Sequence, residues 1–308
     1  MSTTIDRMAR LEELLEKTSR TFALSIPVLP DPTRAEVTIA YLLFRIADTL
    51  EDATAWGAEE KGRELAAFQE QLRRPDAQAT ATMVERWVAR PPLDHAGYNE
   101  LLAETPLVMQ ALADQSEAAR EAIVRYTCET AERMAGFARR SDADGELQLD
   151  DVDDLKDYCY AVAGLVGEML TELFVLDRAQ LAAIAPRLQQ DAATFGEALQ
   201  LVNILKDAAD DATEGRRFLP AEVDLATIFA LARRDLDIAS DYVGRLQQAE
   251  APRGLVEFTA LPVLLAWATL DVVESAGAGA KITRDQVGEI VEGLMLRLEA
   301  GEPAIDRG

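Results

Sequence analysis

The sequence predicts an all-α protein, and three features indicate this. Ala, Leu, Glu and Arg, which favour helices, recur along the whole chain. Alternating β-branched runs, which predict strands, are almost absent. The connections between periodic segments are short and are marked by proline or glycine. No connection is long enough to separate two folding units, so we expect one helical domain over residues 1–308, with residues 299–308 as a flexible tail.

Hydrophobic periodicity between these breaks places the helices in order. Asp31 is a suitable N-cap, Pro32 a suitable first helical residue, and Gly57 a suitable end for the segment that follows them. The predicted helices cover residues 5–17, 32–55, 59–73, 79–89, 94–112, 116–139, 150–173, 178–189, 191–212, 222–248, 253–274 and 284–299.

The segment 32–55 carries charged side chains within an apolar sequence. Tyr41, Arg45, Asp48 and Asp52 stand at i, i+4, i+7 and i+11, so a helix aligns them along one stripe. Burying unpaired charges costs several kcal/mol each, so the stripe needs a partner. Two carboxylates one turn apart suit Mg²⁺, which typically binds one or two carboxylates together with substrate phosphates. An exposed stripe with Arg45 as an ion-pair partner is the alternative.

A second stripe of the same kind favours the metal site. Arg216 and Arg217 follow it closely, which suits a polyanionic ligand. Helices that present both stripes inward would form a metal cage. The second stripe occupies i, i+3, i+7 and i+11 of the helix 191–212, at Gln200, Asn203, Asp207 and Asp211.

Composition excludes several classes of function. The net charge of −24 argues against nucleic acid as a partner, because no basic face is present. Two distant cysteines, Cys128 and Cys159, indicate neither a disulfide framework nor a thiolate metal site, and favour a cytoplasmic location. A single histidine, His95, rules out a histidine-rich metal site. The longest uncharged run, Phe258 to Leu270, is too short to cross a bilayer, so we expect a soluble protein that an apolar product would bring to a membrane surface.

The segment YCYAVAGLVG contains two glycines inside a predicted helix. Gly164 and Gly167 each cost roughly 1 kcal/mol relative to alanine. Close helix packing explains most such glycines. A bulky ligand against this helix, or a kink in it, is the second interpretation, with Tyr158 and Val162 on one face.

Four segments of the chain are SRTFALSIPVLP (19–30), DTLED (48–52), YCYAVAGLVG (158–167) and NILKDAADDATEGRRFLP (203–220). In this order they resemble the squalene and phytoene synthase family of head-to-head prenyl transferases. The resemblance covers most of the chain and is closer to squalene synthases than to phytoene synthases, as is LPVLLAWATL further along. The short segment AKITR also resembles a lysine-containing stretch that squalene synthases use near their nicotinamide cofactor.

The resemblance implies the isoprenoid synthase fold, with both acidic motifs facing each other at the mouth of a central cavity. It also implies roles for individual residues. Mg²⁺ would be held by Asp48, Asp52, Asn203, Asp207 and Asp211. The prenyl diphosphates would be contacted by Thr18, Ser19, Arg20, Thr21, Tyr41, Arg45, Gln200, Lys206, Arg216 and Arg217, and their chains by Phe22, Val162 and Gly167. NADPH would be contacted by Ser19, Arg20, Asn203 and Lys281.

The same resemblance makes Tyr158 the residue for proton transfer or cation stabilisation, acting with Arg45 and the four aspartates of the two motifs. Lys206 departs from the arginine common at its place, which keeps the charge and loses bidentate phosphate binding. Asp210 likewise replaces a glutamate of the second motif.

The expected activity is that of a squalene synthase. It would join two farnesyl diphosphates with Mg²⁺ to give presqualene diphosphate and reduce this with NADPH to squalene. The alternatives are a presqualene diphosphate, hydroxysqualene, dehydrosqualene or phytoene synthase. A non-catalytic helical subunit of the same fold and a generic metal-binding bundle are the more remote alternatives.

Overall fold

The computed structural model describes residues 2–19, 22–140, 147–176, 178–213 and 215–306. It is 79% helical, which confirms the all-α prediction. Contacts along the chain divide it into two compact units, Met1–Arg139 and Arg140–Gly308. The single domain therefore stays a prediction.

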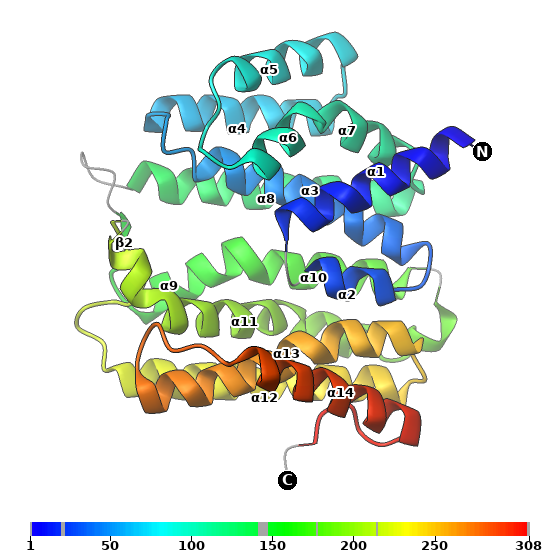
Figure 1. Ribbon diagram of the computed structural model, residues 1–308, viewed down its shortest axis with the longest axis vertical. Coiled ribbons are helices and arrows are strands. Elements are labelled where there is room, and N and C mark those ends of the chain that lie inside the picture. Colours follow the sequence, from blue (N-terminus) through cyan, green and yellow to red (C-terminus); the bar gives the residue numbers. More distant parts are fainter. Residues whose placement is uncertain (1, 20–21, 141–146, 177, 214, 307–308) are drawn as a thin grey trace. The chain divides into compact units, whose positions relative to one another are not determined.

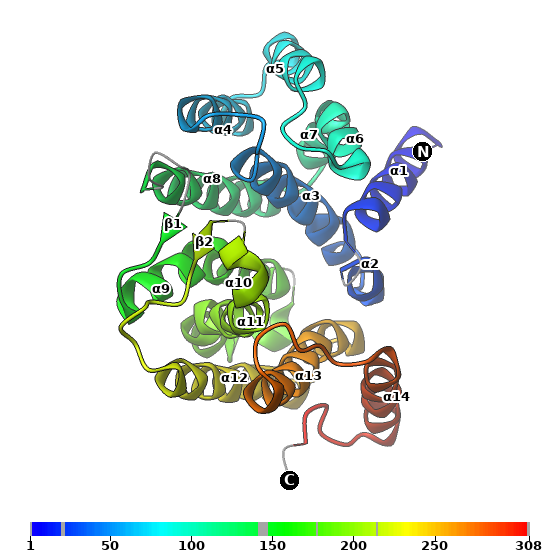
Figure 2. The same ribbon diagram turned by 60° about the vertical axis from the view of Figure 1, so that its left-hand side comes forward.

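The first unit is built around helix α3, which packs against α1, α4, α6 and α7 (Figures 1 and 2). Its apolar side chains, such as Ile39, Leu43 and Ile46, are fully buried. Helix α8 ends at the boundary between the units. The helical elements are α1 Ser2–Thr18, α2 Phe22–Ser25, the 3₁₀ turn η1 Ile26–Val28, α3 Thr33–Glu51, α4 Ala58–Arg73, α5 Ala77–Ala89, α6 Ala96–Ala103, α7 Thr105–Ala113 and α8 Glu117–Arg140.

The second unit is built around helix α11, which packs against α10, α12 and α13, while α14 packs on α13 (Figure 2). Two short parallel strands, β1 and β2, bring the segment before α9 beside the segment after α11. The elements are β1 Leu147–Gln148, α9 Val152–Cys159, the π-helix η2 Tyr160–Gly164, α10 Leu165–Val175, the 3₁₀ turn η3 Ala179–Leu181, α11 Ala185–Thr213, β2 Arg216–Arg217, α12 Leu225–Gln248, α13 Arg253–Ala276 and α14 Arg284–Ala300.

Proline positions explain where the helices differ from the sequence prediction. The predicted helix 94–112 is broken at Glu104, since Pro106 occupies the first turn of α7. Pro186 also lies in a first turn, that of α11, and the predicted break near residue 190 is wrong because α11 runs without interruption. Helix α3 ends at Glu51, earlier than predicted, and its N-cap is Pro32.

The described part of the C-terminal segment is anchored to α12. Gln247 donates from Nε2 to the Glu302 carbonyl oxygen (2.7 Å) and accepts at Oε1 from the Ala304 N–H (2.8 Å). Ala304 is buried. These contacts differ from the frayed end that the sequence suggested.

Glycines allow η2 and α10 to lie directly against α11. A Cβ at Gly167 would lie 2.0 Å from the Ala192 carbonyl oxygen, and one at Gly196 would lie 2.0 Å from that of Ala163. A Cβ at Gly164 would meet Tyr160 Cδ2 at 2.7 Å. Close packing therefore accounts for the glycines of YCYAVAGLVG. The π-helix η2 at the same place supports the predicted irregularity of this helix.

Two helical segments, Val152–Val175 and Arg253–Ala276, are long and apolar enough to cross a membrane by length and composition. About half of each apolar window is buried within the protein. Core helices of soluble proteins meet the same criterion, so this is weak evidence for a membrane span. The expected absence of a transmembrane segment stays a prediction.

The crossing of η2 and α11 predicts a large difference between two glycine substitutions. Gly196→Ala forces a methyl group into the Ala163 carbonyl oxygen, so we expect the free energy of unfolding to fall by about 1–3 kcal/mol or more. Gly244→Ala, on α12 with nothing within 4 Å of its Cβ, is the control and should be neutral or stabilise by up to about 1 kcal/mol. Urea denaturation measures both. Equal effects would show that the crossing is not tight.

Candidate active site

In the first unit, the structure brings three residues of the α3 stripe into contact. Arg45 donates from Nε to the Tyr41 hydroxyl oxygen (3.3 Å), and its Nη1 lies 3.5 Å from Asp48 Oδ2. The Tyr41 hydroxyl in turn donates to the Thr18 carbonyl oxygen (2.9 Å). Burial alone would lower the pKa of Arg45, but the charge of Asp48 and the Tyr41 hydroxyl outweigh it and raise the pKa. Arg45 of α3 is therefore a permanent cation, and Tyr41 connects it to the end of α1.

Asp48 and Asp52 lie at the end of α3, where the helix terminates. The Asp52 N–H donates to the Asp48 carbonyl oxygen (2.8 Å), so Asp52 is the C-cap. Burial raises the pKa of Asp48 to about 6; Arg45 opposes this shift and the charge of Asp52 adds to it. A helix C-terminus carries partial negative charge, so both carboxylates favour a cation there.

Thr18 and Ser19, the two described polar residues predicted at the end of α1, make local hydrogen bonds. The Thr18 side chain is buried and its hydroxyl donates to the Leu14 carbonyl oxygen (2.7 Å), so it is committed to the helix. Ser19 Oγ accepts from the Phe22 N–H (2.9 Å), and the Phe22 ring lies 5.4 Å from that of Tyr41. Arg20 and Thr21 lie outside the described residues.

In the second unit, Lys206 joins two members of the α11 stripe. Its Nζ donates to Asn203 Oδ1 (3.3 Å) and lies 3.1 Å from Asp207 Oδ2. Asp211, one turn further, lies 3.9 Å from Arg216 Nη2. Gln200, one turn before Asn203, is half-buried. The second motif therefore contains its own cations, as the first contains Arg45.

The two strands fix the backbone of Arg216 and Arg217. The Leu147 N–H donates to the Gly215 carbonyl oxygen (3.0 Å), and Leu149 N–H to that of Arg217 (3.1 Å). Gly215 has a φ of 76°, which glycine adopts without strain. The turn after α11 is thus held in place, and both arginines follow the last aspartate closely.

Tyr158 lies against an aromatic ring that the sequence analysis did not single out. The rings of Tyr158 and Phe218 stack with centroids 4.5 Å apart and planes at 27°. Val162 follows one turn later, within η2. The close approach of the Ala192 carbonyl oxygen explains why residue 167 is a glycine. The predicted role of Gly167 in a prenyl channel stays a prediction.

Lys281 lies in a loop that is attached to the second motif. The Gly279 N–H donates to the Lys206 carbonyl oxygen (2.7 Å). Gly277 and Gly279 have φ values of 91° and 86°, which only glycine adopts readily. The Lys281 side chain is exposed. The AGAGA run, which the sequence analysis treated as a break between helices, therefore anchors the segment that carries Lys281.

Glu197, on α11, is an ionisable group of the second unit with a raised pKa, and the sequence patterns did not single it out. Burial raises its pKa to about 7, and Asp235 and Glu168 add to the shift while Lys156 and Arg234 oppose it. Its Oε1 would lie 3.2 Å from a Cβ at Gly164. No pattern in the sequence indicated this, since Glu197 becomes buried only when η2 packs against α11.

Within the described residues, no group of three or more His, Cys, Asp or Glu side chains could hold a metal ion. The cage predicted from the sequence would combine residues of both units, and it stays a prediction. Each motif offers a pair of aspartates, and Mg²⁺ commonly binds one or two carboxylates while taking its other ligands from phosphates and water. The aspartate pairs fit Mg²⁺ that arrives with a diphosphate.

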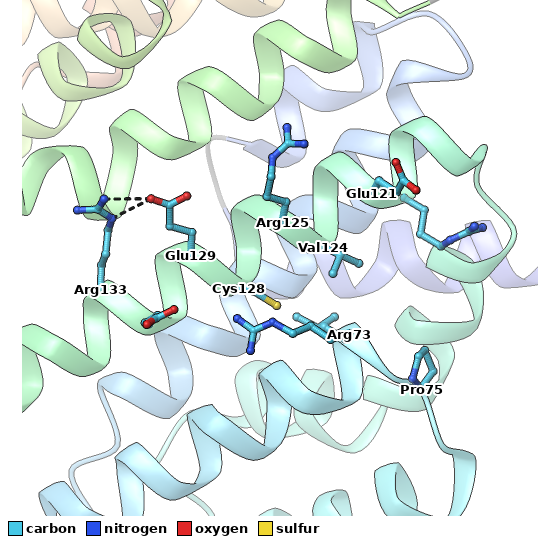
Figure 3. A pocket seen from close by; sticks show the side chains of 11 residues that line it. Arg73, Pro75, Glu121, Val124, Arg125, Cys128, Glu129 and Arg133 are labelled. Carbon is cyan, nitrogen blue, oxygen red and sulfur yellow. Dashed lines mark hydrogen bonds and ion pairs between the residues drawn. The ribbon is translucent and has the colours of Figure 1, made fainter.

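A cavity of about 930 Å³ between α4 and α8 contains none of the predicted site residues. Its arginines, including Arg73, Arg125 and Arg133, point in different directions in Figure 3, and Arg133 is paired with Glu129 (3.0 Å). These side chains do not converge on one anion. The cavity is thus distinct from the candidate site.

The comparison with protein families decides the affiliation of the chain. A profile described as squalene/phytoene synthase matches residues 15–226, which include both acidic stripes. The chain belongs to the squalene/phytoene synthase family. Relatives in this family are prenyl transferase enzymes.

Individual relatives agree with this affiliation. The chain is 28% identical to a squalene synthase of Schizosaccharomyces pombe over 305 residues, which cover 92% of this chain and 64% of the relative. It is 30% identical to squalene synthase 1 of Arabidopsis thaliana over 68% of this chain and 47% of the relative. The chain thus spans less than two-thirds of the length of these relatives. A similar protein of Arabidopsis thaliana, 29% identical, is named inactive squalene synthase 2.

Solved structures confirm the predicted isoprenoid synthase fold. A complex of TcSQS with a ligand has a TM-score of 0.73 and 26% identity, covering 96% of this chain and 89% of that one. A dehydrosqualene synthase in complex with a ligand has a TM-score of 0.56 and 17% identity, covering 97% of this chain and 99% of that one, so it shows the fold alone.

The raised pKa of Glu197 predicts a pH-dependent gain in stability from Glu197→Gln. The folded protein keeps a proton up to pH about 7, whereas the unfolded chain releases it near pH 4.5, so Glu197 makes the protein less stable as pH rises between these values. We expect the melting temperature of the variant, relative to wild type, to increase from pH 5 to pH 8. Glu289→Gln, at an exposed position of α14, controls for the lost charge. A difference in melting temperature between Glu197→Gln and wild type that did not change with pH would contradict the raised pKa of Glu197.

Proposed function

We propose that the chain is a prenyl transferase of the squalene synthase type. It condenses two farnesyl diphosphates head to head into presqualene diphosphate, which is then reduced with NADPH to squalene. The observation that carries this proposal is the pair of aspartate stripes, each with a cation bound to it, on the two central helices α3 and α11. The family match extends over both.

In the first unit, Arg45 provides the charge that a departing diphosphate requires. Its guanidinium presents several N–H donors in one plane, which suits phosphate oxygens. Tyr41 holds it from one side, and Tyr41 is itself fixed by the Thr18 carbonyl oxygen. Asp48, beside Arg45, and Asp52 are the proposed metal ligands of this unit. At the end of α3, Arg45 would therefore bind the diphosphate, and the two aspartates would bind the metal ion.

In the second unit, Lys206 is the cation beside the acidic stripe, as Arg45 is in the first. It is a single point charge rather than a planar fork, so it attracts a diphosphate without fixing its orientation. Arg216 and Arg217 follow on the strand β2 and add donors beside Asp211. Gln200 adds an amide one turn before Asn203. These groups make the end of α11 a second place for phosphate oxygens.

Mg²⁺ fits the aspartate pairs and would be held by Asp48 and Asp52 in one unit and by Asn203, Asp207 and Asp211 in the other. When bound, it supplies positive charge that stabilises the leaving diphosphate. NADPH supplies the hydride for the final reduction, with Lys281, Ser19 and Asn203 as its proposed contacts. Arg20, also proposed to contact it, lies outside the described residues.

The allylic cation left behind needs aromatic and apolar surroundings that exclude water. The rings of Phe22 and Tyr41 lie together in the first unit, and that of Tyr158 is backed by Phe218 in the second. Aromatic faces attract cations. The proton lost when the cyclopropane of presqualene diphosphate closes would be taken by Tyr158 or by the released diphosphate. Val162 would contact the prenyl chains.

The alternatives differ in how the reaction ends. A presqualene diphosphate or hydroxysqualene synthase stops at the first product or adds water, and a dehydrosqualene or phytoene synthase loses a proton. A non-catalytic subunit is disfavoured because Asp48, Asp52, Asp207 and Asp211 are all present, although a relative named inactive exists. We place the protein in the cytoplasm, with peripheral membrane contact when the apolar product leaves and with no nucleic-acid partner.

Product identification tests the proposal. Purified protein is incubated with farnesyl diphosphate and Mg²⁺, with and without NADPH, and the products are identified by mass spectrometry. We expect squalene only with NADPH and presqualene diphosphate without it. A product that does not depend on NADPH would assign the protein to one of the alternative synthases. If no product formed, even with longer prenyl diphosphates, the proposal that the chain is an active prenyl transferase would be contradicted.

A further inference from the structure

A second aromatic ring holds Arg45, and it comes from a helix distant in sequence. The Arg45 Cζ lies 5.6 Å from the centre of the Tyr41 ring and 5.2 Å from that of the Tyr98 ring. Tyr41 is on the same helix as Arg45, but Tyr98 is on α6. The guanidinium is thus contacted by two tyrosine faces and by one carboxylate, that of Asp48.

The first turn of α6 fixes the Tyr98 ring. His95 is the N-cap, and its Nδ1 accepts from the Tyr98 N–H (3.2 Å). The imidazole also stacks on the Tyr98 ring, with centroids 3.8 Å apart and planes at 21°. The lone histidine of the chain therefore orients the tyrosine, both through the backbone and through the ring.

Helix α6 is itself fastened to the end of α1. A Cβ at Gly97 would lie 2.7 Å from the Lys17 carbonyl oxygen, so the two backbones meet there. Lys17 and Arg10 of α1 both pair with Glu100, each at 2.7 Å. Tyr98 is thus connected through α6 to the end of α1, where the Thr18 carbonyl oxygen accepts a hydrogen bond from the Tyr41 hydroxyl.

We propose that Tyr98 is a positioning residue that holds the Arg45 guanidinium for a diphosphate. Arginine has a long side chain that loses considerable freedom when it is fixed, and the two polar contacts of Arg45 are long, at 3.3 and 3.5 Å. The ring of Tyr98 contacts the guanidinium from a different helix, α6. Without it, the guanidinium is free to close fully onto Asp48, which removes a donor from the anion and a carboxylate from the metal.

This inference rests on the proposed function, because it assigns Arg45 to the diphosphate. Its test uses inorganic pyrophosphate with Mg²⁺ and requires no turnover. Calorimetry gives the dissociation constant for wild type, Tyr98→Leu and Tyr98→Phe. We expect Tyr98→Leu to weaken binding roughly 3- to 30-fold, since the cation–ring contact is lost, and Tyr98→Phe to stay within about 2-fold because the ring face remains.

A double-mutant cycle separates positioning from a general structural role. In an Arg45→Lys background, Tyr98→Leu should change the dissociation constant by less than about 2-fold, since the group that Tyr98 orients is gone. Tyr126→Leu is the matched control. It removes another tyrosine stacked on an arginine of the same unit (Arg125 Cζ at 4.6 Å) and should lower the melting temperature without changing pyrophosphate binding.

Three results would overturn the proposal: unchanged binding in Tyr98→Leu, an equal loss in both backgrounds, or no binding of pyrophosphate by the wild type. The weaker binding that we expect, found in a protein that makes no squalene, would support Tyr98 and contradict only the proposed product.

Discussion

The pairing of each acidic stripe with a cation on its own helix is the interaction on which the candidate site depends. Asp48 and Asp52 stand at the end of α3, where the helix dipole adds further negative charge, within a chain of net charge −24. Burial already raises the pKa of Asp48 to about 6. Each motif has a cation of its own helix beside a carboxylate: Arg45 beside Asp48, and Lys206 beside Asp207.

The surrounding elements hold these cations in place. In the first unit, Tyr41 and Tyr98 contact Arg45, and both are tied to the end of α1. In the second, the backbone of Lys206 receives a hydrogen bond from Gly279, and glycines allow η2 and α10 to pack directly on α11. Preorganised charge of this kind is what diphosphate ionisation requires, since groups that are already oriented need no reorganisation during the reaction.

Much of this could be predicted from the sequence, because it depends on local periodicity. The spacing of Asp48 and Asp52 determines their place on one helix, and proline and glycine mark most helix ends. The contacts of Tyr98 with Arg45, and of Phe218 with Tyr158, could not be predicted, since each joins segments that only tertiary packing brings together. Glu197 was missed for the same reason. The continuous α11 was also missed, because a proline in a first turn does not end a helix.

The requirement for both aspartate motifs is the central claim, and turnover of farnesyl diphosphate by Asp52→Asn and Asp207→Asn at saturating Mg²⁺ tests it most directly. Each substitution removes one negative charge at nearly constant volume, so the helical circular dichroism should be unchanged. We expect either variant alone to lose roughly 100-fold or more in kcat. Near-wild-type turnover in either variant would contradict this claim.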